Sequence, residues 1–210
     1  KPGDIKAWRN LSDVEVVALH LWAESHLPIE SVDEKENVVD FGKRSVFRLT
    51  DAFGEDLSRY YVENVFEAMT EPGEWYLDQT QGVLYYLPLP GEEPERSEVI
   101  APRLSELVRL EGNAAAGDTV HDVHFRGLTF SHAEWWLPED SAGYSQAAVG
   151  VPGAVMLRGA ERCSMRGCEV SHVGCYAIEL SDGAQDNEIV GNVLTDLGAG
   201  GVKVGHATQL

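Results

Sequence analysis

Three short polar pairs recur in the second half of the sequence. Each consists of a hydroxyl residue followed by a titratable one, and the pairs are Ser131-His132, Ser171-His172 and Thr195-Asp196. An imidazole gains and loses a proton near neutral pH and a carboxylate is ionised there, so a site that unites them is suited to general acid–base chemistry. Asp196 is the first catalytic candidate, and His172 is a candidate to orient or protonate a partner group.

The pairs belong to an internal repeat. Residues 161–184 align without a gap with residues 185–208, and Met165 meets Ile189, Gly167 meets Gly191 and Ile178 meets Val202. Apolar residues fall two apart within short bursts, which is the period of a β-strand, and Gly, Asn and Asp separate the bursts. Three short strands per repeat predict one coil of a β-solenoid, whereas helical hairpin repeats need longer units with a period of 3.6.

An earlier copy of the repeat is interrupted by an insertion. Residues 123–132 match 163–172, and the second half of this copy resumes at residues 153–160. The intervening segment 133–152 is therefore expected to leave the solenoid at one corner, and insertions on one face usually line the working surface. No polar cap follows the last copy, so we expect the sequence to be part of a longer solenoid.

Residues 1–112 do not repeat and predict a small β-rich domain. Strands are expected at residues 14–22 and 60–64, and Asn64 with Glu67 resembles the start of a short helix. Residues 73–88 predict a hairpin whose apolar positions alternate with polar ones. The aromatic residues of this region are expected in its core rather than on a ligand-binding surface.

Charge and composition exclude several kinds of partner. The formal net charge is −19, with 35 acidic and 16 basic side chains spread over both halves, so phosphate backbones and anionic lipids are repelled. No apolar run reaches the roughly 20 residues of a membrane span. We therefore expect no nucleic-acid partner and no membrane insertion.

The sequence predicts neither a metal nor a cofactor. His121 and His124 lie three apart in a strand and face opposite sides, and GAGG at 198–201 does not link a strand to a helix. The three cysteines, Cys163, Cys168 and Cys175, have no spacing typical of a metal site and are expected to be buried core residues.

Three stretches carry a family resemblance. YYVENVFEAMTEPGEWYLDQTQGVLYYLP (60–88) resembles the segment that precedes the coils in a group of bacterial right-handed parallel β-helix proteins, and GLTFSHAEW and LTDLGAGGVKVG resemble its coil motifs. Characterised members include family 141 glycoside hydrolases, which act on plant cell-wall glycans such as xylan and fucosylated pectin. The coil motifs occur across the wider pectate-lyase-like superfamily, and the GEWYLD block is specific to the group but not to a substrate.

The resemblance implies an all-β fold, with a right-handed parallel β-helix of about three coils in residues 113–210. It implies a carbohydrate-active protein, secreted or periplasmic in a bacterium, that acts on an oligosaccharide or polysaccharide. A glycoside hydrolase is the leading hypothesis. A non-catalytic glycan-binding or surface-adhesion protein and a polysaccharide lyase are the alternatives.

Glycoside hydrolysis needs a second carboxyl group besides Asp196. Glu169 and Glu179, both expected to point away from the coil interior, are the candidates, and Lys203 lies one coil above Glu179, where the two can equally form a solvated ion pair. Candidates for substrate binding are Lys203, His132, Trp135, Trp136 and Tyr144. The aromatic ones suit stacking on sugar rings, although one Trp can instead anchor the loop. Ordinary turn chemistry is the alternative explanation for the His and Asp residues.

Overall fold

The computed structural model describes residues 3–50, 56–144, 146 and 148–205 and is all-β, with helical turns of three residues only. Its contacts define two compact units. Unit 1 comprises Lys1–Glu98 and Leu137–Ala147, and unit 2 comprises Val99–Trp136 and Ala148–Leu210. Unit 2 thus begins before the expected boundary at residue 113, and the insertion is divided between the two units. None of the helices in the described ranges is long and apolar enough to span a bilayer.

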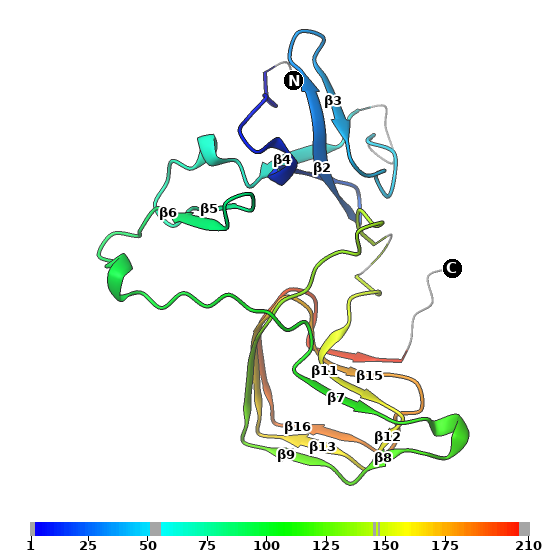
Figure 1. Ribbon diagram of the computed structural model, residues 1–210. Coiled ribbons are helices and arrows are strands. Elements are labelled where there is room, and N and C mark those ends of the chain that lie inside the picture. The colour runs from blue at the N-terminus through cyan, green and yellow to red at the C-terminus, as the bar shows by residue number, and fades with distance from the viewer. Residues whose placement is uncertain (1–2, 51–55, 145, 147, 206–210) are drawn as a thin grey trace. The chain divides into compact units, whose positions relative to one another are not determined.

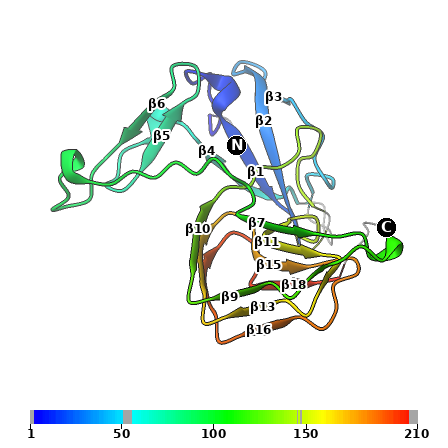
Figure 2. The same ribbon diagram turned by 60° about the horizontal axis from the view of Figure 1, so that its bottom comes forward.

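Unit 2 is built of parallel β-sheets, and the strands of each sheet come from successive repeats of the chain (Figure 1, Figure 2). The sheet orders are β10-β14-β17, β18-β15-β11-β7 and β16-β13-β9, with the short pair β12-β8 at one corner. The strands are β7 (Val108–Glu111), β8 (Val120–His121), β9 (His124–Arg126), β10 (Thr129–Ala133), β11 (Gly153–Arg158), β12 (Ala160–Glu161), β13 (Ser164–Arg166), β14 (Glu169–Val173), β15 (Tyr176–Leu180), β16 (Glu188–Val190), β17 (Val193–Leu197) and β18 (Val202–Val204). A 3₁₀ turn, η4, covers Ala114–Ala116.

The strand register confirms the predicted repeat. Ser171 pairs with Thr195 and with Ser131, which are the partners that the sequence alignment gave. One strand was not anticipated: β7 pairs with β11 in register, Val108 opposite Val155, although residues up to 112 were assigned to the non-repeating region. β7 has only four residues, and no other strand of the repeat precedes it in the sequence, so alternation alone could not identify it.

Apolar side chains from successive strands fill the interior of unit 2. Val155 and Ile178 are fully buried neighbours in one such column, whereas Val202, which pairs with Ile178 on β18, is 43% exposed. All three cysteines are free and buried, as predicted. Burial, followed by the negative charge of Glu134, raises the pKa of the Cys175 thiol to about 11.

Asparagine side chains join successive repeats at two bends of the stack. The amide of Asn192 accepts a hydrogen bond from the Cys168 N–H at 2.8 Å and donates one to the Met165 carbonyl at 2.9 Å. Asn187 makes the equivalent bonds one bend earlier in the repeat. The backbone N–H groups of Cys163 and Cys168, which lie in bends between strands, obtain their acceptors in this way.

Unit 1 is built on an antiparallel sheet of order β3-β2-β1-β4. Its strands are β1 (Glu15–Leu19), β2 (Glu24–Asp33), β3 (Val38–Phe41) and β4 (Arg59–Glu63), and its 3₁₀ turns are η1 (Leu11–Asp13), η2 (Phe66–Ala68) and η3 (Pro94–Arg96). Val14, Val16, Leu27 and Ile29 form its buried apolar cluster. The helix expected near Asn64 is only the short turn η2, because the Asn64 side chain bonds the backbone of Leu77 instead of capping a helix.

The predicted hairpin is present as β5 (Trp75–Asp78) and β6 (Val83–Tyr86), paired antiparallel. Its buried face differs from the expected one. Tyr76 and Asp78 are buried while Trp75 is 63% exposed, so the expectation that the aromatic residues lie in the core holds for only some of them. The guanidinium of Arg9 lies 3.7 Å from the Phe66 ring centroid and bonds Asp78, which explains why a carboxylate can be buried here.

Burial raises the pKa of Asp78, but hydrogen bonds from Gln81 and Asn10 and the charge of Arg9 together hold that pKa below its ordinary value. A folded-state pKa below the unfolded one stabilises the protein above the unfolded pKa of about 3.9, and this stabilisation is lost as the pH falls further. We expect Asp78→Asn to lower stability at pH 7 and to make it less sensitive to acidification below about pH 5. Urea unfolding of the full chain across this range measures both effects.

The matched control is Asp40→Asn on β3, an exposed carboxylate that accepts a hydrogen bond from Ser31. This variant should follow the pH profile of the wild type. An Asp78→Asn profile parallel to that of the wild type would contradict the prediction.

Candidate functional site

The three titratable residues of the repeated pairs lie in one column across the sheet β10-β14-β17. Ser131, Ser171 and Thr195 pair in register, as do Ala133, Val173 and Leu197, whereas His132, His172 and Asp196 between them are not paired. These three residues have positive φ values of 65°, 54° and 52°. Each strand therefore bends at the same residue, and the bend turns the side chain outward, as β-bulges beside active sites do.

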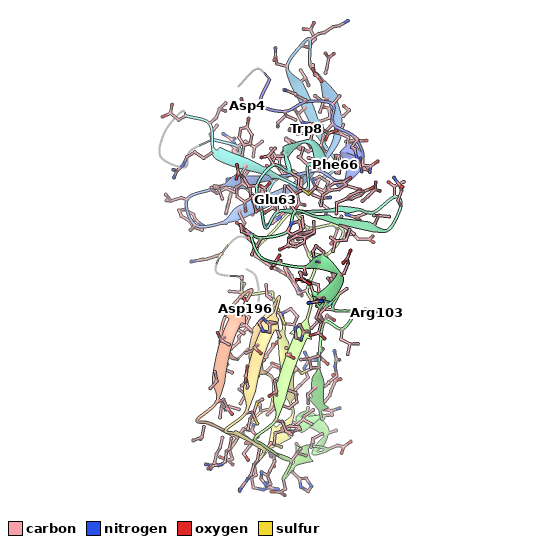
Figure 3. The ribbon with its side chains drawn as sticks, turned by 90° about the vertical axis from the view of Figure 1, so that its left-hand side faces the viewer. Asp4, Trp8, Glu63, Phe66, Arg103 and Asp196 are labelled. Carbon is pink, nitrogen blue, oxygen red and sulfur yellow. The ribbon has the colours of Figure 1, made fainter. Side chains whose placement is uncertain are left out.

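The side chains of this column are in contact. The rings of His132 and His172 are stacked with centroids 5.0 Å apart, close to the strand spacing of about 4.8 Å. His172 Nδ1 lies 2.5 Å from Asp196 Oδ2, and His132 Nδ1 lies 2.9 Å from the Ser131 hydroxyl. Asp196 stands at the end of β17 (Figure 3), and its side chain is 69% exposed. The structure thus brings together the residues that the sequence placed in one column.

The backbone at these positions favours residues other than histidine. A left-handed conformation is free of strain for glycine, and glycines occupy the neighbouring left-handed column at Gly127, Gly167 and Gly191. His and Asp are tolerated there but not preferred to glycine. Asp122, Arg162 and Asp186 form a further left-handed column in which Arg162 bonds Asp122, so a polar bend alone is no proof of a site.

The geometry defines what this group can do chemically. The ionised Asp196 carboxylate can only accept, so it takes the Nδ1–H of His172, and this 2.5 Å contact orients the imidazole ring. The second carboxylate oxygen of Asp196 is available to a ligand on the exposed surface. An aspartate and a histidine held in this way can bind a polar ligand and transfer a proton to or from it.

The glycines after Asp196 are required for packing. A Cβ at Gly198 would lie 2.5 Å from the carbonyl oxygen of Gly174. A Cβ at Gly200 would lie 2.5 Å from the ring of Tyr176. These glycines allow close packing of successive repeats, so any ligand must approach Asp196 from the exposed side of the column.

The two candidates for a second carboxyl differ in their surroundings. Glu169 is exposed on β14, between Thr129 and Val193 of the neighbouring strands. Glu179 is buried, accepts the Gly153 N–H at 3.0 Å and lies 3.2 Å from the Lys203 ammonium. The expected ion pair with Lys203 exists, but it is buried rather than solvated.

The same contacts engage Lys203, a predicted substrate-binding residue. Its ammonium donates to the Val151 carbonyl at 2.7 Å and lies 5.5 Å from the centroid of the Tyr176 ring. Gly153 makes the arrangement possible, because a Cβ there would lie 2.7 Å from the Cβ of Glu179. Glu179 and Lys203 therefore hold the segment before β11 against β15 and β18.

The aromatic residues of the insertion are not in equivalent positions. Trp136 is 64% exposed. Trp135 is half-buried, and its backbone N–H donates to the carboxylate of Glu134. Both belong to unit 2, whereas Tyr144 belongs to unit 1. Trp136 is accordingly the described aromatic residue of the insertion with the most surface available to a ligand.

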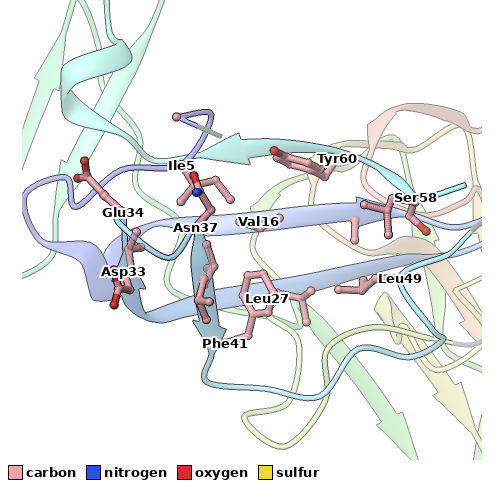
Figure 4. Close-up of a pocket in the computed structure, with 16 residues that line it drawn as sticks. Ile5, Val16, Leu27, Asp33, Glu34, Asn37, Phe41, Leu49, Ser58 and Tyr60 are labelled. Carbon is pink, nitrogen blue, oxygen red and sulfur yellow. The ribbon is translucent and has the colours of Figure 1, made fainter. Parts of the chain in front are cut away.

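Unit 1 contains a pocket that sequence reasoning missed. Its volume is about 440 Å³, and Val16, Leu27 and Phe41 lie on its apolar walls (Figure 4). Asn37 and Tyr60 contribute polar groups at its margin. Asp33 and Glu34 also line the pocket, but their carboxylates accept the backbone N–H groups of Lys35 and Ala7, so the column of unit 2 is the stronger candidate for chemistry.

A second cluster was also missed. Glu15, His26 and Glu63 have ligand atoms that all lie within 4.8 Å of one another. They come from three strands whose order in the sheet differs from their order in the sequence. Glu15 is the only polar residue of β1, so no alternation along that strand indicated that it faces away from the core.

A solved structure titled "Glycoside hydrolase" has a similar fold. Its TM-score is 0.78, with 20% sequence identity over 93% of this chain and 39% of that chain. No protein-family model matches the sequence, and no curated protein matches it. The likeness supports an all-β fold with stacked parallel sheets, and this chain spans about two-fifths of the length of the structure that it resembles.

The buried ion pair predicts a loss of stability. We expect Glu179→Gln to lower the free energy of unfolding by about 2 kcal/mol. Glutamine is uncharged, so it interacts less strongly with the half-buried ammonium of Lys203 and with the Gly153 N–H. Urea unfolding measures the change.

The same substitution at Glu188, whose pair with Arg166 is exposed, is the control and should cost less than about 1 kcal/mol. Equal losses in the two variants would show that burial of the Glu179 pair has no special effect.

Proposed function

We propose that unit 2 is a segment of a right-handed parallel β-helix, about three coils long, in a carbohydrate-active protein. The leading function is hydrolysis of glycosidic bonds in a plant or other complex polysaccharide. The fold likeness to a structure titled "Glycoside hydrolase" and the resemblance of the GEWYLD block support this proposal. The proposal includes export to a secreted or periplasmic location, where such polysaccharides are found.

One observation carries the proposal: the column of the half-buried His132 and the exposed His172 and Asp196. In the proposed reaction Asp196 is one of the two carboxyl groups that glycoside hydrolysis usually needs, and His172 orients it through the 2.5 Å contact. Glu169 is the better candidate for the second carboxyl within this chain, because Glu179 is already committed to a buried ion pair. The stacked His132 extends the polar surface along the column.

The test replaces Asp196 by Asn in the protein as its gene encodes it. Asparagine keeps the size of the side chain and tolerates the left-handed backbone but cannot act as a carboxylate base. We expect the release of reducing sugars from xylan and pectin to fall by roughly 100-fold or more. The rate is measured for wild type and variant over a range of substrate concentrations.

Asp186→Asn is a closely matched control. Asp186 lies in the same repeat, is exposed and has φ 55°, close to the 52° of Asp196. It should retain wild-type turnover. Unchanged turnover in Asp196→Asn would remove Asp196 from the chemistry and with it the central argument for hydrolysis at this column.

Non-catalytic glycan binding is the second candidate function. It is favoured by the 64% exposure of Trp136 and by the engagement of Glu179, which leaves fewer free carboxylates in unit 2. We expect Trp136→Ala to weaken binding of xylan or pectin oligosaccharides by about fivefold, since a stacked aromatic ring contributes on the order of 1 kcal/mol. Calorimetric titration measures the affinity.

Trp75→Ala serves as the control, because Trp75 is equally exposed but belongs to the hairpin of unit 1. Saturable binding that depends on Trp136, without products after long incubation, favours the binding function. Products that absorb in the ultraviolet would instead identify a polysaccharide lyase.

A further inference from the structure

The sheet of unit 1 has two faces of different character. Alternate residues of β1 and β2, among them Val16 and Leu27, face the apolar cluster, while Glu15 and His26 lie on the opposite face. Glu63 (labelled in Figure 3) is on the neighbouring strand β4, directly opposite Glu15 in the register. One imidazole and two carboxylates therefore converge from three adjacent strands.

The side chains are held close together. His26 Nδ1 lies 2.7 Å from Glu15 Oε2, and His26 Nε2 lies 3.4 Å from Glu24 Oε1. The backbone N–H of His26 donates to the Ala142 carbonyl at 2.7 Å, so a segment of the insertion fixes β2 at this residue. Groups carried by paired strands are positioned more rigidly than groups on loops.

The cluster carries more negative charge than its described partners neutralise. Glu15 and Glu63 are like charges at directly opposite positions of an antiparallel pair, an arrangement that is destabilising by itself. Within the described residues, Glu15 and Glu24 form ion pairs with His26 and not with Lys or Arg.

We propose that Glu15, His26 and Glu63 bind a divalent transition-metal ion such as zinc. A mixed set of imidazole and carboxylate ligands suits such ions, and three protein ligands leave one tetrahedral position for water. With metal–ligand distances of about 2.1 Å, ligand atoms lie about 3.4 Å apart, so the observed separations of up to 4.8 Å require only small side-chain rotations. The ion would relieve the repulsion between the two carboxylates.

The contacts assign a role to each nitrogen of His26. Nδ1 faces Glu15 and is the proposed ligand, because an ion there can contact Glu15 and Glu63 as well. Nε2 faces Glu24, which then accepts its proton and orients the ring, as carboxylates do for metal-binding histidines. The site lies on unit 1 and is independent of the Asp196 column.

The experiment titrates the full chain with ZnCl₂ by calorimetry after chelator treatment and buffer exchange. One ion should bind per chain, and Glu63→Gln should weaken binding at least tenfold. Glu63 is exposed, so this substitution is not expected to impair folding, which circular dichroism checks. Zinc should also raise the melting temperature of the wild type by more than that of Glu63→Gln, because an ion that binds only the folded state stabilises it.

Glu30→Gln is the matched control, since Glu30 is an exposed glutamate on β2 outside the cluster. It should bind zinc like the wild type. The proposal is overturned if the wild type binds no zinc, or if Glu63→Gln and Glu30→Gln bind it equally. Neither result depends on whether the protein hydrolyses a glycan.

Discussion

The in-register pairing of parallel strands from successive repeats is the constraint on which unit 2 depends. It places Ser171 between Ser131 and Thr195, and it stacks apolar residues such as Val155 and Ile178 in the interior. A shift by one residue would turn every side chain of a strand to the opposite face. The register thus determines at once which residues form the core and which side chains meet on the surface.

Much of unit 2 could be predicted from the sequence because the residue pattern that defines its strands is short and recurs along the chain. The alignment of 161–184 with 185–208 predicted the strand partners, and it placed His172 next to Asp196. The burial of Glu179 was not predictable in the same way, because it depends on the segment before Gly153, which lies outside the repeated pattern. The strand β7 was missed for a related reason: its partner β11 follows only after an insertion.

Unit 1 shows the limits of sequence reasoning more clearly. The hairpin β5–β6 was predicted from alternation and turn residues, but its inward face was not, because Arg9 and Phe66 create a buried environment for Asp78 and Tyr76. No short-range pattern indicates that a carboxylate will find such a partner more than sixty residues away. The convergence of Glu15, His26 and Glu63 likewise depends on the strand order of the sheet.

The left-handed bend at positions 132, 172 and 196 has a consequence for how such a surface can diversify. Gly, Asn, Asp and His are all compatible with this backbone conformation, so one can replace another without altering the path of the chain. The strand pairing on either side of each bend is therefore fixed, while the side chain at the bend can change. Substitution among these residues changes the exposed group at a bend while the strand pairing on either side stays the same.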